Sequence, residues 1–271
     1  MNEKLDKSLK KIGLMGRMDD YVIDIERSTL IYYKNEEAEY MVVPDGISVI
    51  DDYCFSQMNK LKGVRLPDTL EYIGTGAFDS CTRLEKIEIP DSVKEIGSGV
   101  FSKCMSLTEV KLPSRLYELP DWTFYCCDSL EKVEMTDSVE LIGSACFHSC
   151  SNLLELNLSK NITELKEYCF YCCGIESINL ESVRTMGFKC FSESDIRTIK
   201  IPDTATTVDT RGLFEGCRRL KKAYIGDGVK ELDNRTFFKC NALRELNVGK
   251  DCMMGVTCLD YENNVNIIRR S

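Results

Sequence analysis

Phenylalanine recurs along the chain at a nearly fixed interval, and this periodicity constrains the fold more than any other feature. Successive members of the series are 23 residues apart, except for one step of 21 residues. The nine phenylalanines are Phe55, Phe78, Phe101, Phe124, Phe147, Phe170, Phe191, Phe214 and Phe237. A period of this length is typical of a solenoid, in which each unit buries its apolar face only against its neighbours. The sequence therefore predicts one elongated domain.

Each period contains the signals of a strand followed by a turn. In the repeat that begins at Phe78, the apolar residues Leu84, Ile87 and Ile89 have strand spacing. Pro90 ends this strand because proline has no amide hydrogen to donate. The repeat that begins at Phe170 is the shorter one, and we expect it to bend the solenoid locally.

The repeat carries a family resemblance, which the most regular unit shows well. The residues concerned are Ala77, Phe78, Leu84, Ile87, Ile89, Pro90, Ser92, Val93, Ile96 and Gly97. The pattern resembles the BspA-like leucine-rich repeats of bacterial surface antigens and some protist proteins, and it extends from Val43 to about Cys252. The resemblance implies a leucine-rich-repeat solenoid of the α/β or mostly β class: a curved, right-handed superhelix with one parallel sheet. It also implies roles in adhesion and protein binding, and no catalytic residues.

The sequence divides into four segments. Residues 1–20 have apolar side chains at helical spacing and allow a short helix. Residues 21–43 predict an N-terminal capping hairpin and a first strand, because two strand-like runs flank the turn at 26–29. The leucine-rich repeats occupy residues 44–252, and residues 253–271 are expected to form a C-terminal cap.

The overall charge limits the classes of partner. The formal net charge is −9, which disfavours broad binding to nucleic acid or to anionic membranes. No apolar stretch is long enough to predict membrane insertion, and the first residues do not resemble an export signal. For the sequence as given we expect a cytoplasmic protein; the alternative is a surface or secreted protein whose natural N-terminus is longer.

The fifteen cysteines follow the repeat rather than a ligand motif. Seven of the cysteines lie three residues after a periodic phenylalanine: Cys81, Cys104, Cys127, Cys150, Cys173, Cys217 and Cys240. Met58 and Ser194 occupy the same position in other repeats, which favours packing by a compact side chain. The spacing is not that of a zinc site, so we expect no metal and no cofactor. Reduced thiols are expected; disulfides between neighbouring turns are the alternative, because turns about 4.8 Å apart permit them.

The outward positions of the predicted sheet differ between the two halves of the chain. In the first half, charges alternate in sign along and across the strands, as Lys86, Glu88, Glu109 and Lys111 illustrate. Later the same positions carry Asn179, Lys200, Tyr224 and Asn247. Basic residues collect there as well: Arg197, Lys200, Arg211, Arg218, Arg219, Lys221, Lys222, Arg235 and Arg244. This edge is either a solvated charged face or a site for an acidic protein segment.

Aromatic residues gather beside the phenylalanine in the middle repeats. We name Trp122, Tyr125, His148, Tyr168 and Tyr171 the aromatic ridge. If these side chains face outward they suit a protein interface; the alternative is partial burial against the adjoining turn. His148 is the only histidine, and the cysteines nearest to it in the pattern are expected to be buried, where the thiolate is disfavoured. Catalysis is therefore not expected.

These observations predict a non-enzymatic function: a monomeric scaffold that binds a protein or peptide through its solenoid surface. The predicted partner-binding residues are Trp122, Tyr125, His148, Tyr168, Tyr171, Asn179, Lys200, Tyr224 and Asn247. The alternative is an adhesive or structural protein that acts by self-association or by binding to a matrix. An enzyme ranks third, because solenoid surfaces seldom enclose a pocket.

Overall fold

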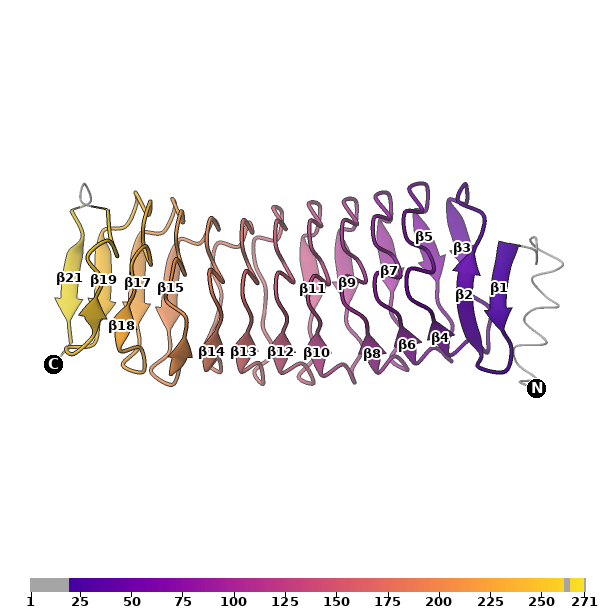
Figure 1. Cartoon of the computed structure of the whole chain (residues 1–271), viewed down its shortest axis with the longest axis horizontal. Coiled ribbons are helices and arrows are strands. Elements are labelled where there is room, and N and C mark those ends of the chain that lie inside the picture. Colours follow the sequence, from indigo (N-terminus) through magenta and orange to yellow (C-terminus); the bar gives the residue numbers. More distant parts are fainter. Residues whose placement is uncertain (1–19, 261–263, 271) are drawn as a thin grey trace.

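The computed structural model describes residues 20–260 and 264–270, which form an elongated solenoid of stacked turns (Figure 1). Strands of neighbouring turns pair in parallel about 23 residues apart, which confirms the predicted leucine-rich-repeat architecture. The short helix expected within residues 1–20 lies outside the described residues, apart from Asp20. Among the residues described, no helix has the length and apolarity needed to cross a membrane.

Two rows of strands run along the molecule, where the sequence predicts one parallel sheet (Figure 1). The long row consists of β3 (Tyr40–Val42), β5 (Gly63–Arg65), β7 (Lys86–Glu88), β9 (Glu109–Lys111), β11 (Lys132–Glu134), β15 (Thr198–Ile201), β17 (Lys222–Ile225), β19 (Glu245–Val248) and β21 (Asn266–Arg269). The short row consists of β2 (Thr29–Tyr33), β4 (Val49–Ile50), β6 (Tyr72–Ile73), β8 (Glu95–Ile96), β10 (Glu118–Leu119), β12 (Leu141–Ile142), β13 (Glu164–Leu165), β14 (Thr185–Met186), β16 (Thr207–Val208), β18 (Glu231–Leu232) and β20 (Met253–Met254). The short row arises because the second apolar pair of each repeat also pairs with its neighbours.

Both ends of the solenoid continue the rows. Strand β1 (Tyr21–Asp24) pairs antiparallel with β2, which itself pairs in parallel with β4. The hydroxyl of Tyr21 donates a hydrogen bond of 3.0 Å to the carbonyl of Val42 in β3. At the other end, β20 and β21 pair with β18 and β19. The capping roles of the two end segments and the right-handed curvature stay predictions.

The long row is interrupted in the middle of the molecule. Strand β11 is the last strand of one sheet, and β15 is the first of the next. Between them lies an isolated bridge that joins Glu155 to Ser177. The interruption coincides with the 21-residue repeat, whose shorter path changes the register of the chain there.

The nine periodic phenylalanines form one continuous stack inside the solenoid. Neighbouring rings have centroids 5.0 to 5.8 Å apart and planes within 21° of parallel. All nine side chains are buried. The backbone repeats with them: the amide of Phe78 donates to the carbonyl of Val100, and that of Phe101 to the carbonyl of Thr123. Each turn is therefore bonded to the next at the position of its ring.

The recurrent cysteines make a second ladder beside the rings. Six thiols donate to the carbonyl oxygen of the phenylalanine 26 residues earlier, at 3.0 to 3.2 Å: Cys81, Cys104, Cys127, Cys150, Cys217 and Cys240. A thiol thus fills a small buried space and also satisfies a buried carbonyl. Burial raises the pKa of these groups, that of Cys81 to about 12, so they resist ionisation. The structure has all fifteen cysteines as thiols.

We predict that a maleimide probe labels two thiols of the folded protein at neutral pH, Cys126 and Cys172. These two are partly exposed, whereas the other cysteines are buried. Mass spectrometry after labelling gives the count, and labelling after denaturation without reductant should reach fifteen. Native labelling of Cys127 would contradict the buried ladder, and a shortfall after denaturation would reveal disulfides.

Candidate protein-binding surfaces

Four members of the aromatic ridge, Tyr125, His148, Tyr168 and Tyr171, form a contiguous group of rings. Because its repeats are of equal length, equivalent residues lie on adjacent turns. The centroids of Tyr125 and His148 are 4.7 Å apart, and those of His148 and Tyr171 are 4.8 Å apart. Tyr168 meets Tyr171 edge-on at 5.8 Å. These four side chains are partly exposed, so each alternative raised by the sequence holds in part: the rings cover one another and still reach the surface.

Phe188 extends the ridge, and the sequence analysis missed it. Its ring contacts Tyr168 edge-on at 5.4 Å, and the guanidinium of Arg211 lies over the ring at 5.3 Å. Phe188 and Phe238 are the two phenylalanines outside the periodic series. Phe238 is likewise covered by a cation, because the guanidinium of Arg235 lies 4.7 Å from its centroid. The departure of Phe188 and Phe238 from the 23-residue period was the sequence signal that could have identified them as surface residues.

His148 is a neutral member of the ridge. Its Nδ1 and the hydroxyl of Ser149 share a hydrogen bond of 2.9 Å. Burial lowers the pKa of the imidazole, so the ring is uncharged at neutral pH. The thiol of Cys150 is buried and donates to the carbonyl of Phe124 at 3.1 Å, and burial raises its pKa well above its usual range. The ladder thiol therefore acts in packing, and nothing in its geometry activates it as a nucleophile.

Trp122 is half exposed and has an unusual backbone conformation. Its side chain retains 51% of its accessible surface, and its φ is 58°. Its amide donates to the carbonyl of Ser144, at 2.8 Å, so the stacking of turns fixes this conformation. All nine repeats have positive φ at this position, and three of them have glycine there: Gly76, Gly99 and Gly212, with φ of 57°, 62° and 62°. A bulky residue at positive φ costs about 1 to 2 kcal/mol relative to glycine.

The polar residues of the second half lie mostly together. Lys200, Tyr224 and Asn247 are register partners on β15, β17 and β19. They border an open groove of about 470 Å³, which we name the polar groove. Asn179 does not line the groove but directly follows Ser177 and Ile178, which do; its side-chain oxygen accepts a hydrogen bond from the amide of Glu181 at 3.1 Å.

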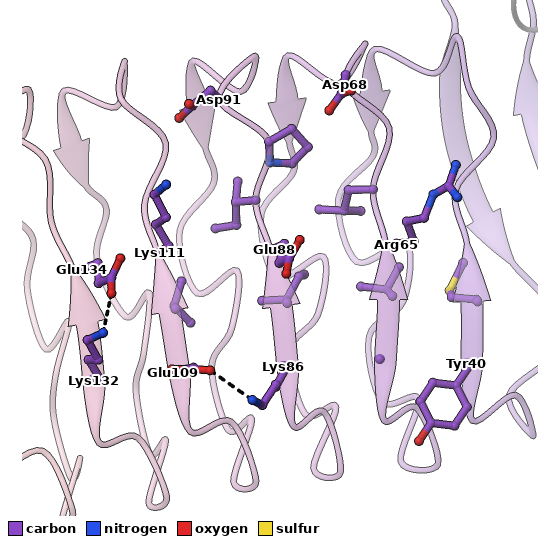
Figure 2. A pocket seen from close by; sticks show the side chains of 18 residues that line it. Tyr40, Arg65, Asp68, Lys86, Glu88, Asp91, Glu109, Lys111, Lys132 and Glu134 are labelled. Carbon is purple, nitrogen blue, oxygen red and sulfur yellow. Dashed lines mark hydrogen bonds and ion pairs between the residues drawn. The ribbon is translucent and has the colours of Figure 1, made fainter.

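A larger groove covers the long row in the first half (Figure 2). Its volume is about 870 Å³, and charged side chains of alternating sign line it. The register confirms the predicted checkerboard, because Lys86 lies opposite Glu109 and joins it in an ion pair of 3.1 Å. Lys132 instead pairs with Glu134 along its own strand (Figure 2). The charges of this groove thus largely neutralise one another.

Comparison with known proteins agrees with the architecture. The model of the BspA-type leucine-rich repeat region matches residues 28–153 and 118–244 in overlapping segments, so the chain belongs to this family. A leucine-rich repeat protein from Bacteroides ovatus has a similar solved structure, with a TM-score of 0.71 and 21% identity, covering 89% of this chain and 78% of that one. A leucine-rich cell surface protein from Faecalibacterium prausnitzii has a TM-score of 0.47 and 17% identity, with 93% of each chain covered. No curated protein matches the sequence.

We predict that Trp122→Gly is more stable than Trp122→Ala by about 1 kcal/mol, because glycine alone relieves the positive φ. Urea unfolding of both variants measures the difference. The matched control is Gly99→Ala, which should lose a similar amount. A Cβ at Gly99 would meet the Cβ of Ser102 at an ordinary 3.7 Å, so its cost comes from the backbone. Equal stability of the two Trp122 variants would refute the strained conformation.

Proposed function

We propose that the protein is a non-enzymatic scaffold that binds a protein or peptide partner through the aromatic ridge. The observation that carries the proposal is the exposed aromatic surface: Trp122 retains about half of its accessible surface, and the rings of Tyr125, His148 and Tyr171 follow one another on adjacent turns at the surface. Neither the solvent-exposed indole nor its positive φ stabilises the fold, which supports a role in contact. Tryptophan and tyrosine are also the residues that most often anchor protein interfaces.

The shape of the ridge supports a macromolecular partner. Trp122 and Tyr171 are two turns apart, so the ridge with Phe188 spans roughly 15 Å at about 4.8 Å per turn. This length suits a helix or a loop of a partner protein. The rings stack face to face, so they offer their edges and hydroxyl groups rather than a cavity. Such a surface can bind a partner, but it does not enclose a small substrate.

We expect the double variant Trp122→Gly and Tyr171→Ala to fold and to lose capture of its partner by at least tenfold, because two anchors of one interface are removed. Affinity capture with crosslinking from the native cell, quantified by mass spectrometry, measures the loss. Circular dichroism confirms the fold.

Tyr53→Gly is the matched control for this experiment. Tyr53 occupies the repeat position of Trp122, with φ of 56° and 58% exposure, but it lies outside the ridge. Capture should survive this change. If the control loses the partner as well, or if the double variant retains it, the ridge is not the contact surface.

End-to-end self-association is the second candidate. Strand β21 is the last strand of its sheet, and all four of its residues are exposed. Ile267 and Ile268 retain 43% and 38% of their accessible surface. An edge of this kind can pair with a strand of another chain.

Sedimentation velocity distinguishes the two candidates. Under the scaffold proposal the protein stays monomeric at concentrations up to about 100 µM. An edge contact with a dissociation constant below that concentration would give oligomers instead. Concentration-dependent oligomers that Ile268→Lys abolishes would favour self-association instead.

A further inference from the structure

The rim of the long row reverses its charge beside the polar groove. Arg197, Lys221 and Arg244 lie on consecutive turns, because the amide of Lys221 donates to the carbonyl of Arg197 and that of Arg244 to the carbonyl of Lys221. In earlier turns the same rim position carries Glu39, Lys62, Glu85, Thr108, Glu131, Leu154 and Glu176, and Lys62, the one cation among them, pairs with Glu39 at 2.8 Å. A chain with a net charge of −9 thus concentrates positive charge at one place on its surface.

Three cations at this place form no ion pair among the residues described. Arg197 pairs with Glu176, and Lys222 pairs with Glu245 at 2.9 Å. Lys200, Lys221 and Arg244 are exposed and have no such partner; the guanidinium of Arg244 donates to the backbone carbonyls of Asn241 and Leu243. The ammonium of Lys200 lies over the ring of Tyr224, 5.8 Å from its centroid. The groove therefore has unneutralised positive charge at its floor and at its rim.

The remaining lining supplies neutral hydrogen-bonding groups. Ser177, Thr198 and Asn247 line the groove, and Ser177 belongs to the bridge where the long row is interrupted. Hydroxyl and amide groups of this kind can bond to the backbone of an extended chain. The ring of Tyr224 is held in place by the guanidinium of Arg270, which lies 4.0 Å from its centroid.

We propose that the polar groove binds an extended acidic segment of a partner protein. Carboxylates of the segment pair with Lys200 and Lys221, and its backbone bonds to the hydroxyl and amide groups between them. The proposal rests on the proposed scaffold function and adds a second contact surface with a defined chemistry. The acidic remainder of the molecule repels such a segment, so attraction is confined to the groove.

Nucleic acid fits this groove less well. Binding of single strands depends on bases that stack on exposed aromatic rings. The one aromatic ring of the groove lining is already covered by Arg270 and overlain by Lys200. Acidic residues such as Glu245 also interrupt the positive field. A carboxylate-bearing peptide needs no free ring.

The first half of the chain offers a matched control residue. Lys111 has the same position in its repeat as Lys200, on the same face of the long row. Its register partners are Glu88 on β7 and Glu134 on β11, so it lies between two carboxylates (Figure 2). Removing Lys111 changes the net charge of the protein as much as removing Lys200 does.

The test is fluorescence anisotropy with the full chain and a labelled dodecapeptide of alternating glutamate and glycine. We expect Lys200→Ser combined with Lys221→Ser to weaken binding about tenfold, or about threefold for each partly exposed charge pair. Lys111→Ser should change the affinity by less than twofold. Raising the salt concentration from about 50 to 200 mM should weaken binding of the unmodified protein more than that of the double variant.

Several outcomes would overturn the proposal. They are no binding of the peptide by the unmodified protein, an equal loss in Lys111→Ser, no loss in the double lysine variant, or tighter, lysine-dependent binding of a dodecamer of thymidylate. The ridge variant Trp122→Gly with Tyr171→Ala should bind the peptide normally. Failure of the groove and failure of the ridge are thus separate results.

Discussion

The bonding of each turn to the next is the constraint on which the rest of the structure depends. The amide of Phe78 reaches the carbonyl of Val100, and the ring of Phe78 stacks on that of Phe101 at 5.7 Å. Both contacts recur from turn to turn, and the amide of Phe170 still reaches the carbonyl of Cys190 in the 21-residue repeat. The shortened repeat shows the result of a change: the ring stack continues from Phe170 to Phe191 at 5.2 Å, but the long row is interrupted. The stack of buried rings is thus preserved across the shortened repeat, whereas the strand pairing of the long row is lost there.

The thiol ladder depends on the same register. Six cysteines donate to the phenylalanine carbonyl 26 residues earlier, whereas Cys173, at the shortened repeat, approaches the carbonyl of Cys150 at 3.5 Å. The thiol is a weak donor, so its value lies in filling a small space while satisfying a buried carbonyl. In one repeat Ser194 replaces the thiol, and its hydroxyl lies 3.5 Å from the sulfur of Cys217 on the next turn. Recurrent cysteine here reflects packing between turns.

The repeat predicted most of the fold, because a fixed period specifies which residues meet on adjacent turns. It predicted the buried phenylalanines, the pairing of Lys86 with Glu109, and the contacts of Tyr125, His148 and Tyr171. The second row was missed because two-residue strands such as β8 have no distinct pattern of their own. The positive φ of Trp122 was also missed, because only three of the nine repeats have glycine at this position, Gly76, Gly99 and Gly212. The role of Asn179 as a contact residue stays a prediction, because Asn179 does not line the polar groove.

The surfaces proposed for binding lie where the stacking constraint leaves a choice. The core positions admit only residues that fit between neighbouring turns, so they vary little. The position of Trp122 favours glycine, and the sheet face of the first half favours charges that neutralise one another. Trp122 places a bulky aromatic side chain at such a backbone position, and Lys200 places an unpaired lysine on the sheet face of the second half, over the ring of Tyr224. Trp122 leaves half of its surface in solvent, and Lys200 forms no ion pair among the residues described, so a contact outside the chain is a better explanation of both than the stacking of turns.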